Sequence, residues 1–450
     1  MSESPGPRGR PEPPPYWERA EELRHILEVQ GCLGLLLIDF SKLGRVERSY
    51  GSGTFANLLS TSRDLLMELR GDGVRSTDIL AINDKGDTFL VFLSRKRQEG
   101  AMTISDLHSA SERVEDHLNR RLVQLDSPYL QGRHQVAVGY SVVFENPLVK
   151  PERLVSRLVD EAWESVRAHQ RERELQERRW LQEVLLEDKL ATLFQPVFEL
   201  RRRTILGYEA LTRGPSGTTY HMPLRLFEMA ADSNLVFELD RKCRRRALTA
   251  SRSLPRDALL FVNVLPSAMY DPAFQGPALL RFLGELDLEP GRIVLEITEK
   301  YAIENYTMFG ESLEEFRKVG FQIAVDDVGA GYSGLEKIAQ LNPRYLKLDR
   351  ELIKDIDSSH IRREMTRALK AFADRIGSTI IAEGIEREGE LRTLMDLGID
   401  YGQGFLLGSP VAHALPPTQP EASEPAGSSG GGSSAREVRL QRPHRLEKQG

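Results

Sequence analysis

The chain has 450 residues, and since a typical domain has ~150 residues, we expect two or three domains. Lysine and arginine total 61 against 67 aspartates and glutamates, and the resulting net charge of −6 argues against a general nucleic-acid-binding protein. Apolar runs such as residues 33–38 are far shorter than the roughly 20 residues of a membrane-spanning helix, so we expect no contact with a membrane. Only 2 cysteines, and an N-terminus without an apolar signal core, favour a cytoplasmic protein.

The two ends of the chain differ in composition from the rest. Residues 1–15 and 414–450 are rich in proline and small polar residues, and we expect both to be disordered because they have little apolar surface to bury. Residues 16–150 carry the pattern of a small α/β domain. In that stretch an amphipathic helix over 17–29 precedes four expected strands, which are GLLLIDF, DILAIND, DTFLVFLS and HQVAVGYSVVF.

Residues 151–189 predict a long helix between two domains. Its middle, RAHQRERELQERR, carries almost no apolar stripe, so we interpret it as a solvated linker helix. A coiled-coil dimer seam is the alternative, although sustained apolar heptads are absent.

Residues 190–413 repeat one pattern, in which an apolar strand ends in a polar residue and is followed by a loop and a helix. Successive ends are separated by the length of a strand, a helix and their loops. With LFQPVFEL as an eighth strand, the pattern predicts a closed (β/α)8-type, TIM-like barrel whose C-terminal strand ends share one mouth. The strands and their polar ends are ILGYEAL with Glu209, LLFVNV with Asn263, RIVLEITE with Glu296, QIAVDDVGAG with Asp326, RYLKLD with Lys347, TIIAEGIE with Glu383 and YGQGF with Gln403.

A shared mouth would crowd several carboxylates together. Any one of Glu209, Glu296, Asp326, Asp327 and Glu383 could be an ordinary surface acid, but gathered together each close pair at ~4 Å repels by about 4 kcal/mol. We therefore expect cations that offset this charge. Because the ligand atoms are all oxygens, two Mg²⁺ or Mn²⁺ ions are favoured over Zn²⁺. Two such ions suit attack of water on a phosphodiester.

Two basic residues could serve the same chemistry. Lys347 could hold or deprotonate the attacking water or contact a phosphate, and a structural lysine paired with a carboxylate is an equally open interpretation. Arg213, in EALTR, has a planar guanidinium suited to a substrate phosphate.

The ordered motifs GYEALTRG, FVNV, LEITE, DDVGAG, LKLD, AEGIE and YGQGF resemble those of EAL-domain cyclic-di-GMP phosphodiesterases across residues 190–413. The resemblance implies metal-dependent hydrolysis of cyclic-di-GMP to linear pGpG in bacterial second-messenger signalling, and a homodimer formed through the EAL domain. It also implies a role for each matching residue. Glu209, Asn263, Glu296 and Asp326 hold one metal ion; Asp326, Asp327 and Glu383 hold the second; Lys347, Glu383 and Gln403 are catalytic; Gln195, Leu211, Arg213 and Asp349 contact the substrate; Glu299 and Glu386 brace the active-site loops.

One position departs from that family pattern. Val328 stands where family members usually have phenylalanine after the paired aspartates. The departure bears on the loop at 327–334, which in the family links metal binding to dimerisation, more than on the chemistry.

The first domain resembles an eroded GGDEF domain, the diguanylate cyclase module that accompanies many EAL domains. Its signature is Lys85-Gly86-Asp87-Thr88-Phe89, in which Thr88 stands where the family has a catalytic carboxylate. Asp39 is kept, but Ser41 takes the second acidic position, and Glu47 and Arg48 replace the residues that recognise guanine. Because two-metal nucleotidyl transfer needs carboxylates, we expect no cyclase activity and a structural or regulatory role.

Upstream, Arg75-Ser76-Thr77-Asp78 resembles the RxxD inhibitory site at which such domains bind the cyclic dinucleotide, with a surface ion pair as the alternative. Two other functions stay open for the whole chain. One is a non-catalytic cyclic-di-GMP receptor, and the other is a scaffold whose first domain recruits a protein partner. A complete acidic set with Lys347 and Gln403 favours the phosphodiesterase, because a receptor need not retain them.

Overall fold

The computed structural model of the chain describes residues 13–44, 46–47, 51–69, 75, 77–83, 85–93, 103–124, 136–299, 306–329 and 334–412. The predicted disorder of residues 414–450 and of residues 1–12 lies outside these ranges. Disorder was also predicted for residues 13–15, but there the carbonyl oxygen of Pro14 accepts from the backbone N–H of Ile82 at 3.1 Å and Pro15 forms a β-bridge with Ile82. Across these ranges, no helix has both the length and the apolar character that crossing a bilayer requires. The chain divides into two compact units. One consists of Met1–Leu193, Ala210–Arg252 and Val262–Glu289, and the other of Phe194–Glu209, Ser253–Phe261 and Pro290–Gly450.

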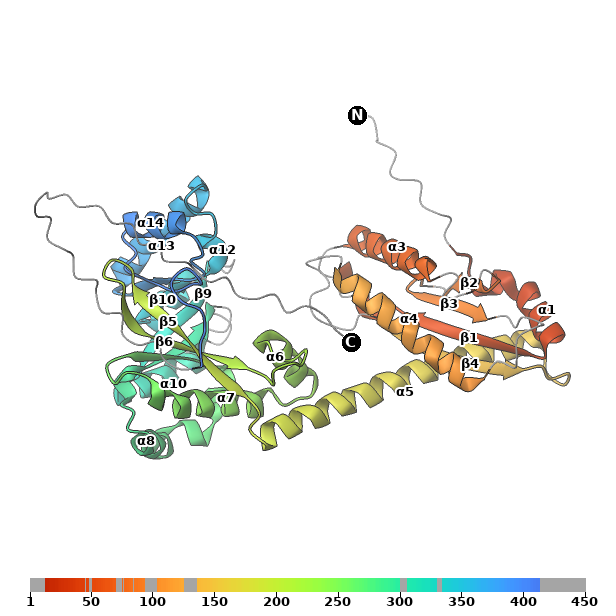
Figure 1. Cartoon of the computed structure of the whole chain (residues 1–450), viewed down its shortest axis with the longest axis horizontal. Helices are drawn as coiled ribbons and strands as arrows, with labels where there is room; N and C mark the ends of the chain where they lie inside the picture. The colour runs from red at the N-terminus through yellow and green to blue at the C-terminus, as the bar shows by residue number, and fades with distance from the viewer. Residues whose placement is uncertain are drawn as a thin grey trace, which may run out of the picture. The chain divides into compact units, whose positions relative to one another are not determined.

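The N-terminal part contains a 4-stranded antiparallel sheet in the order β2-β3-β1-β4, labelled in Figure 1. The inner strand β1 (Cys32–Asp39) is almost wholly buried, as its apolar run requires. Because successive side chains of a strand point to opposite faces, Leu36 and Ile38 pack with α3 and α4, whereas Leu35 and Leu37 pack with α1 and α5. This arrangement confirms the predicted small α/β domain. The other elements are α1 (Ala20–Gln30), α3 (Ser52–Glu68), β2 (Ile79–Ile82), β3 (Thr88–Leu93), α4 (Ile104–Gln124), β4 (Ala137–Phe144) and α5 (Pro151–Leu186).

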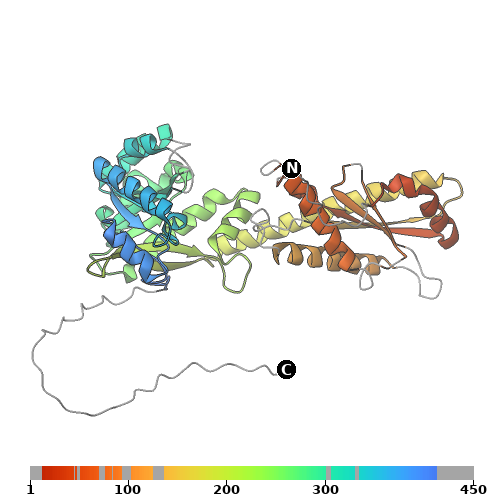
Figure 2. The same cartoon turned by 90° about the horizontal axis from the view of Figure 1, so that it is seen from above.

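Helix α5 is one continuous helix, drawn in yellow in Figure 2. Side chains at its two ends are buried, whereas those of its middle are exposed or half-buried. Its first turns bury Leu158 and Val166 in the core beneath the sheet, so that core continues past residue 150. Its last turns bury Leu181 and Val184 against α6 (Pro223–Asp232) and α7 (Val236–Ala250). Between these ends the side chains are exposed or half-buried, in agreement with the missing apolar stripe.

In the described part of the chain, eight strands close into a barrel in the order β10-β11-β12-β5-β6-β7-β8-β9. The strand pairs β8–β9, β9–β10, β10–β11 and β11–β12 are parallel. Helices follow most of the strands, and this arrangement confirms the predicted (β/α)8-type barrel. The strands are β5 (Ala191–Glu199), β6 (Thr204–Arg213), β7 (Leu259–Asn263), β8 (Ile293–Thr298), β9 (Gln322–Val328), β10 (Tyr345–Leu348), β11 (Thr379–Ala382) and β12 (Tyr401–Gly402). The helices are α8 (Gly276–Glu285), α10 (Tyr306–Val319), α11 (Leu335–Leu341), α12 (Arg350–Ile353), α13 (His360–Ile376) and α14 (Glu388–Asp396).

The first strand departs from the usual all-parallel barrel, because β5 runs antiparallel to β12. Only residues 200–203 connect β5 to its other neighbour, β6. A parallel neighbour requires a crossover of a dozen or more residues, so this short connection can only reverse the chain direction.

The barrel core explains which way the polar strand ends face. Its buried residues include Phe261, Val294, Ala324, Tyr345 and Ile381, which pack together in the interior. Each of them stands two positions before one of the predicted polar ends. Since side chains two apart along a strand share a face, the polar residues are directed into the barrel mouth above this core.

Candidate active site

A group of predicted polar residues is buried at the C-terminal ends of the barrel strands. Glu209 on β6, Glu296 on β8 and Lys347 on β10 are 6%, 1% and 0% exposed. Asp326, on β9, and Gln403, immediately after β12, are also buried. All of them belong to the second compact unit, so their mutual geometry is defined within one body.

Lys347 lies at the centre of this group. Its Nζ is 2.6 Å from a carboxylate oxygen of Glu383, 2.7 Å from Glu296, 3.2 Å from Glu209 and 3.5 Å from Asp326. Burial alone would lower the pKa of Lys347, but the four carboxylates raise this pKa well above its usual value. The side chain is therefore a firmly held cation.

The carboxylates of the group are strongly perturbed. Burial raises the pKa of Glu296 and of Glu383 well above the usual value, and neighbouring carboxylates act in the same direction. The pKa of Asp326 rises to about 6, first because of burial and then because of Glu209, while Lys347 opposes the shift. One lysine thus fails to neutralise the site, and further positive charge is needed there.

Asp326 and Asp327 reach the same mouth because β9 contains an irregularity. Val325 pairs with Leu346 and Val328 with Leu348, so both aspartates oppose the single residue Lys347. Such a bulge re-aims a side chain that regular alternation would place on the other face. Asp327 has a left-handed backbone with φ 57°, which is uncommon for a residue other than glycine. This bulge was not predicted from the sequence, although two adjacent acids followed by Val328 and Gly329 were a visible signal.

Gln403 links two of the acids. Its Nε2 donates hydrogen bonds to Glu209 Oε2 at 2.6 Å and to Glu383 Oε1 at 3.1 Å. Its Oε1 is buried, and among the described residues this oxygen has no hydrogen-bond partner. A buried carbonyl oxygen without a partner is costly, so this atom is suited to accept a hydrogen bond from a water or ligand in the site.

Three carboxylates of the site are arranged as ligands for a divalent cation. Asp326, Asp327 and Glu383 each offer a carboxylate oxygen, and these oxygens lie within 4.8 Å of one another. Oxygen donors of this kind suit hard divalent ions such as Mg²⁺ and Mn²⁺.

The residues expected to contact the substrate, and the ligand Asn263, lie on barrel strands or just after them. Asn263 is the exposed last residue of β7. Leu211 and Arg213 are in the last part of β6, and Arg213 Nη1 donates to the carbonyl oxygen of Thr212 at 2.8 Å. Gln195, on β5, donates to the carbonyl oxygen of Gly408 at 3.1 Å, and Asp349 caps α12 by accepting from the backbone N–H of Glu351 at 2.7 Å. Their contacts with a substrate stay predictions.

The two residues expected to brace loops each contact a neighbouring segment. Glu299 is buried, and its Oε2 accepts from the backbone N–H of Gly329 at 3.1 Å. Glu386 pairs with Arg350 at 2.9 Å. Val328 is buried at the end of β9. Its predicted effect on loop behaviour is untested, because residues 330–333 lie outside the described ranges.

The residues that resemble an eroded signature in the first domain form a tight hairpin turn between β2 and β3. Thr88 is fully buried and pairs across the sheet with Asp39. Asn83 Nδ2 donates hydrogen bonds to Asp87 Oδ1 at 2.9 Å and to Thr88 Oγ1 at 3.0 Å. The carboxylate of Asp87 and the hydroxyl group of Thr88 therefore both stabilise this turn.

The predicted inhibitory site forms a second turn in the same domain. Asp78 is buried, and its Oδ2 accepts from the backbone N–H of Arg75 at 2.7 Å. Binding of a nucleotide at this turn stays a prediction, and Ser76 and Arg48 lie outside the described residues.

The fold and the site together define an α/β-barrel protein in which acidic strand ends surround a buried lysine and suit divalent cations. The family model of the EAL domain matches residues 178–410, which is more than half of the sequence. The chain belongs to the EAL domain family.

Two curated relatives and one solved structure show the extent of the similarity. The uncharacterized protein Mb1389c of Mycobacterium bovis is 31% identical over 255 residues, covering 53% of this chain and 41% of the relative. The probable cyclic di-GMP phosphodiesterase PdeI of Escherichia coli K12 is 30% identical over 230 residues, covering 50% of this chain and 29% of the relative. The chain thus spans less than two thirds of either relative. The FimX EAL domain of Xanthomonas citri, solved in complex with c-diGMP, has the same fold with a TM-score of 0.50, 22% identity, and coverage of 55% of this chain and 99% of that domain.

Proposed function

We propose that this chain is a metal-dependent phosphodiesterase that hydrolyses cyclic di-GMP to linear pGpG. The observation that carries the proposal is the set of four carboxylates within 3.5 Å of Lys347 Nζ at the C-terminal strand ends of an EAL barrel. A relative of 30% identity is named a probable cyclic di-GMP phosphodiesterase, which supports the substrate. The predicted acidic residues and the family of the barrel both support metal-dependent hydrolysis of a phosphodiester.

The site residues have three roles in this proposal, which are to hold cations, to orient water and to bind the substrate. Two Mg²⁺ or Mn²⁺ ions, when bound, lower the pKa of the attacking water and neutralise charge on the phosphate. Lys347 and the carbonyl oxygen of Gln403 orient that water, which the buried position of both groups supports. We assign Glu209, Asn263, Glu296 and Asp326 to one ion, Asp326, Asp327 and Glu383 to the other, and Gln195, Leu211, Arg213 and Asp349 to the substrate.

The first domain, in the same proposal, is a GGDEF-like module without cyclase activity that regulates the barrel. Thr88, which cannot bind a metal as a carboxylate does, is buried at the signature turn beside Asp39. The barrel forms a homodimer, and the first domain is the place for a protein partner.

The test is a product assay with the full chain, cyclic di-GMP and either Mg²⁺ or Mn²⁺. We expect pGpG as the product and loss of turnover in Glu209→Ala, because the carboxylate that contacts Lys347 and Gln403 is removed. Glu199→Ala is the matched control, since Glu199 is a partly exposed acid at the end of β5 that lies 3.6 Å from Arg202. Tight binding of cyclic di-GMP without product at any metal concentration would replace the proposal with a receptor.

A further inference from the structure

A second buried acid lies close to the candidate site but outside it. Glu390 is the third residue of α14 and is 2% exposed. Its Oε2 accepts hydrogen bonds from the backbone N–H groups of Glu386 and Arg387, both at 3.0 Å. Its Oε1 accepts from the backbone N–H of Asp355, also at 3.0 Å. A glutamate at this position of a helix ordinarily bonds one backbone N–H, that of the helix cap, whereas Glu390 bonds three from two segments.

The hydrogen bonds outweigh the cost of burying this carboxylate. Burial by itself raises the pKa of Glu390, but the backbone N–H groups of Glu386, Asp355 and Arg387 and the Arg387 side chain lower it below the usual value. Glu390 is therefore held as an anion whose two oxygens are both occupied.

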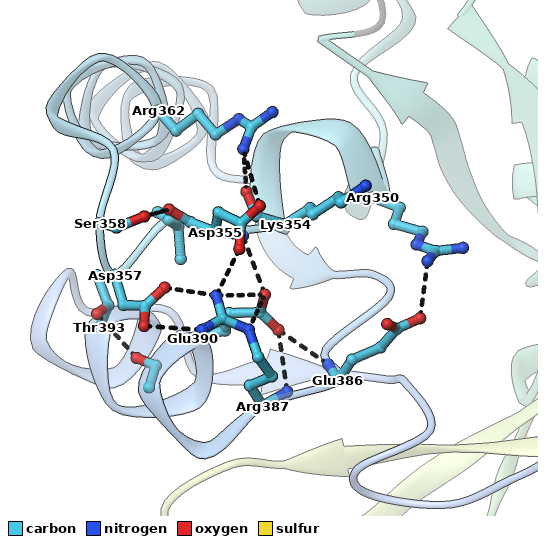
Figure 3. A network of polar contacts seen from close by, with 12 residues as sticks. Arg350, Lys354, Asp355, Asp357, Ser358, Arg362, Glu386, Arg387, Glu390 and Thr393 are labelled. Carbon is cyan, nitrogen blue, oxygen red and sulfur yellow. Dashed lines mark hydrogen bonds and ion pairs between the residues drawn. The ribbon is translucent and has the colours of Figure 1, made fainter.

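Arg387 extends the connection between the two segments, as Figure 3 shows. Its Nη2 lies 2.9 Å from Asp355, 2.6 Å from Asp357 and 3.1 Å from Glu390. A separate ion pair joins Glu386 to Arg350 at 2.9 Å. The segment after β11 and the segment that follows β10 and α12 are thus tied together at several points.

Both tied segments continue directly from the candidate active site. The one held by Glu390 begins with Glu383, whose carboxylate lies 2.6 Å from Lys347 Nζ. Gly384, the residue after Glu383, has φ +66°. A Cβ added to Gly384 would lie 2.4 Å from Cγ of Arg350, in the other segment. The backbone from Glu383 onward therefore has little freedom to shift independently of these contacts.

We propose that Glu390 is a positioning residue for the candidate active site. By binding three backbone N–H groups it fixes residues 383–387 against residues 355–357, and it thereby holds the Glu383 carboxylate where a divalent cation and Lys347 meet it. This inference rests on the proposed function and deepens it. The alternative is that Glu390 only caps α14 and stabilises the fold.

The test compares Glu390→Gln with the wild type in the full chain. Glutamine keeps the shape, but its single carbonyl oxygen can face either the Glu386 and Arg387 N–H groups or the Asp355 N–H, and its NH₂ group meets donors on the other side. We expect kcat for cyclic di-GMP to fall about 10- to 100-fold with KM little changed, and Mn²⁺ affinity measured by calorimetry to fall by a similar factor. Glu388→Gln is the matched control, because Glu388 lies in the same helical turn with a half-exposed side chain and a long ion pair to Arg203 at 3.6 Å. It should match the wild type in both measurements.

The outcomes separate the two roles of Glu390 and the two proposals. If Glu390→Gln melts at a lower temperature but keeps the wild-type kcat and Mn²⁺ affinity well below that temperature, Glu390 is only a cap and the inference is wrong. If the wild type binds Mn²⁺ without producing pGpG, the proposed function fails, and the Mn²⁺ affinities of the two variants still decide the role of Glu390. If the wild type neither binds Mn²⁺ nor turns over, both proposals are overturned.

Discussion

Replacing Asp327 by asparagine separates the stability of the site from its capacity to bind cations. Asp327 has a left-handed backbone with φ 57°, which asparagine also tolerates, so the substitution removes a charge with little change of conformation. Burial raises the pKa of Asp327, and the nearby carboxylate of Asp349 raises it further. The side chain therefore has an energetic cost in the absence of a cation.

The expected change in the free energy of unfolding follows from the distances between the carboxylates of Asp326, Asp327 and Glu383. The ligand oxygens of Asp326, Asp327 and Glu383 lie within 4.8 Å, and two full charges at that distance repel by about 3.5 kcal/mol at an effective dielectric constant of ~20. Lys347 and partial protonation remove part of this repulsion. We expect Asp327→Asn to raise the free energy of unfolding by about 1 kcal/mol without metal, which corresponds to roughly 2–4 °C in Tm.

Addition of Mn²⁺ should make the wild type more stable than Asp327→Asn. At a metal concentration of about 100 times its Kd, the wild type gains about 2.7 kcal/mol. If loss of the carboxylate weakens binding about 10- to 100-fold, the variant gains only about 0.4 to 1.4 kcal/mol. Thermal unfolding of both proteins, with and without Mn²⁺, measures these changes directly.

Asp374→Asn is the control, because Asp374 is an exposed acid on α13 that pairs with Lys370. It should change the free energy of unfolding by no more than about 0.5 kcal/mol and leave the Mn²⁺ response intact. An Asp327→Asn variant that gained as much stability from Mn²⁺ as the wild type would show that Asp327 does not face the cation shared by Asp326 and Glu383.

Two further predictions concern the segment after β11. Gly384→Ala should lower the free energy of unfolding in urea by about 2 kcal/mol or more, because a positive φ and a Cβ 2.4 Å from Arg350 Cγ act together. Gly217→Ala, with φ +77° and no atom within 4 Å of the added Cβ, should show only the backbone cost of about 1 kcal/mol, and equal losses would mean that Arg350 simply moves aside. Because the pKa of Glu390 is lowered in the folded state, its stabilising effect is present above the unfolded-state pKa of about 4.3 and is lost as pH falls through the folded-state value. The Tm of the wild type should therefore fall more than that of Glu390→Gln between about pH 6 and about pH 3.5, whereas parallel curves would exclude this contribution.

The strands and most of the acidic group were predictable because their signal is local. An apolar run that ends in a polar residue marks both a buried strand and the direction of its last side chain, as at Glu296 and Lys347. The reversed direction of β5 was not predicted, although residues 200–203 leave no room for a crossover. The bulge that brings both Asp326 and Asp327 into the mouth was not predicted, because a bulge is a property of the pairing of two strands and the alternation of one strand places adjacent residues on opposite faces.

Glu390 illustrates a second limit of the sequence. The residues Arg387-Glu388-Gly389-Glu390 have the composition of an ordinary solvated helix start. Glu390 is buried because residues 355–357 pack over it and supply a backbone N–H and two carboxylates that pair with Arg387. Segments 30 to 35 positions apart create that environment, so no local pattern contains it.

The number of hydrogen-bond donors on Lys347 gives the strongest physical reason for a cation at this site. An ammonium group has three N–H donors, whereas four carboxylates approach Lys347 Nζ within 3.5 Å. Gln403 supplies donors to Glu209 and Glu383 but carries no charge. The excess negative charge must then be met either by protons, as the raised pKa values of Glu296 and Glu383 indicate, or by divalent ions. Because protons and divalent ions compete for the same oxygens, Mn²⁺ binding to this site should weaken as pH falls.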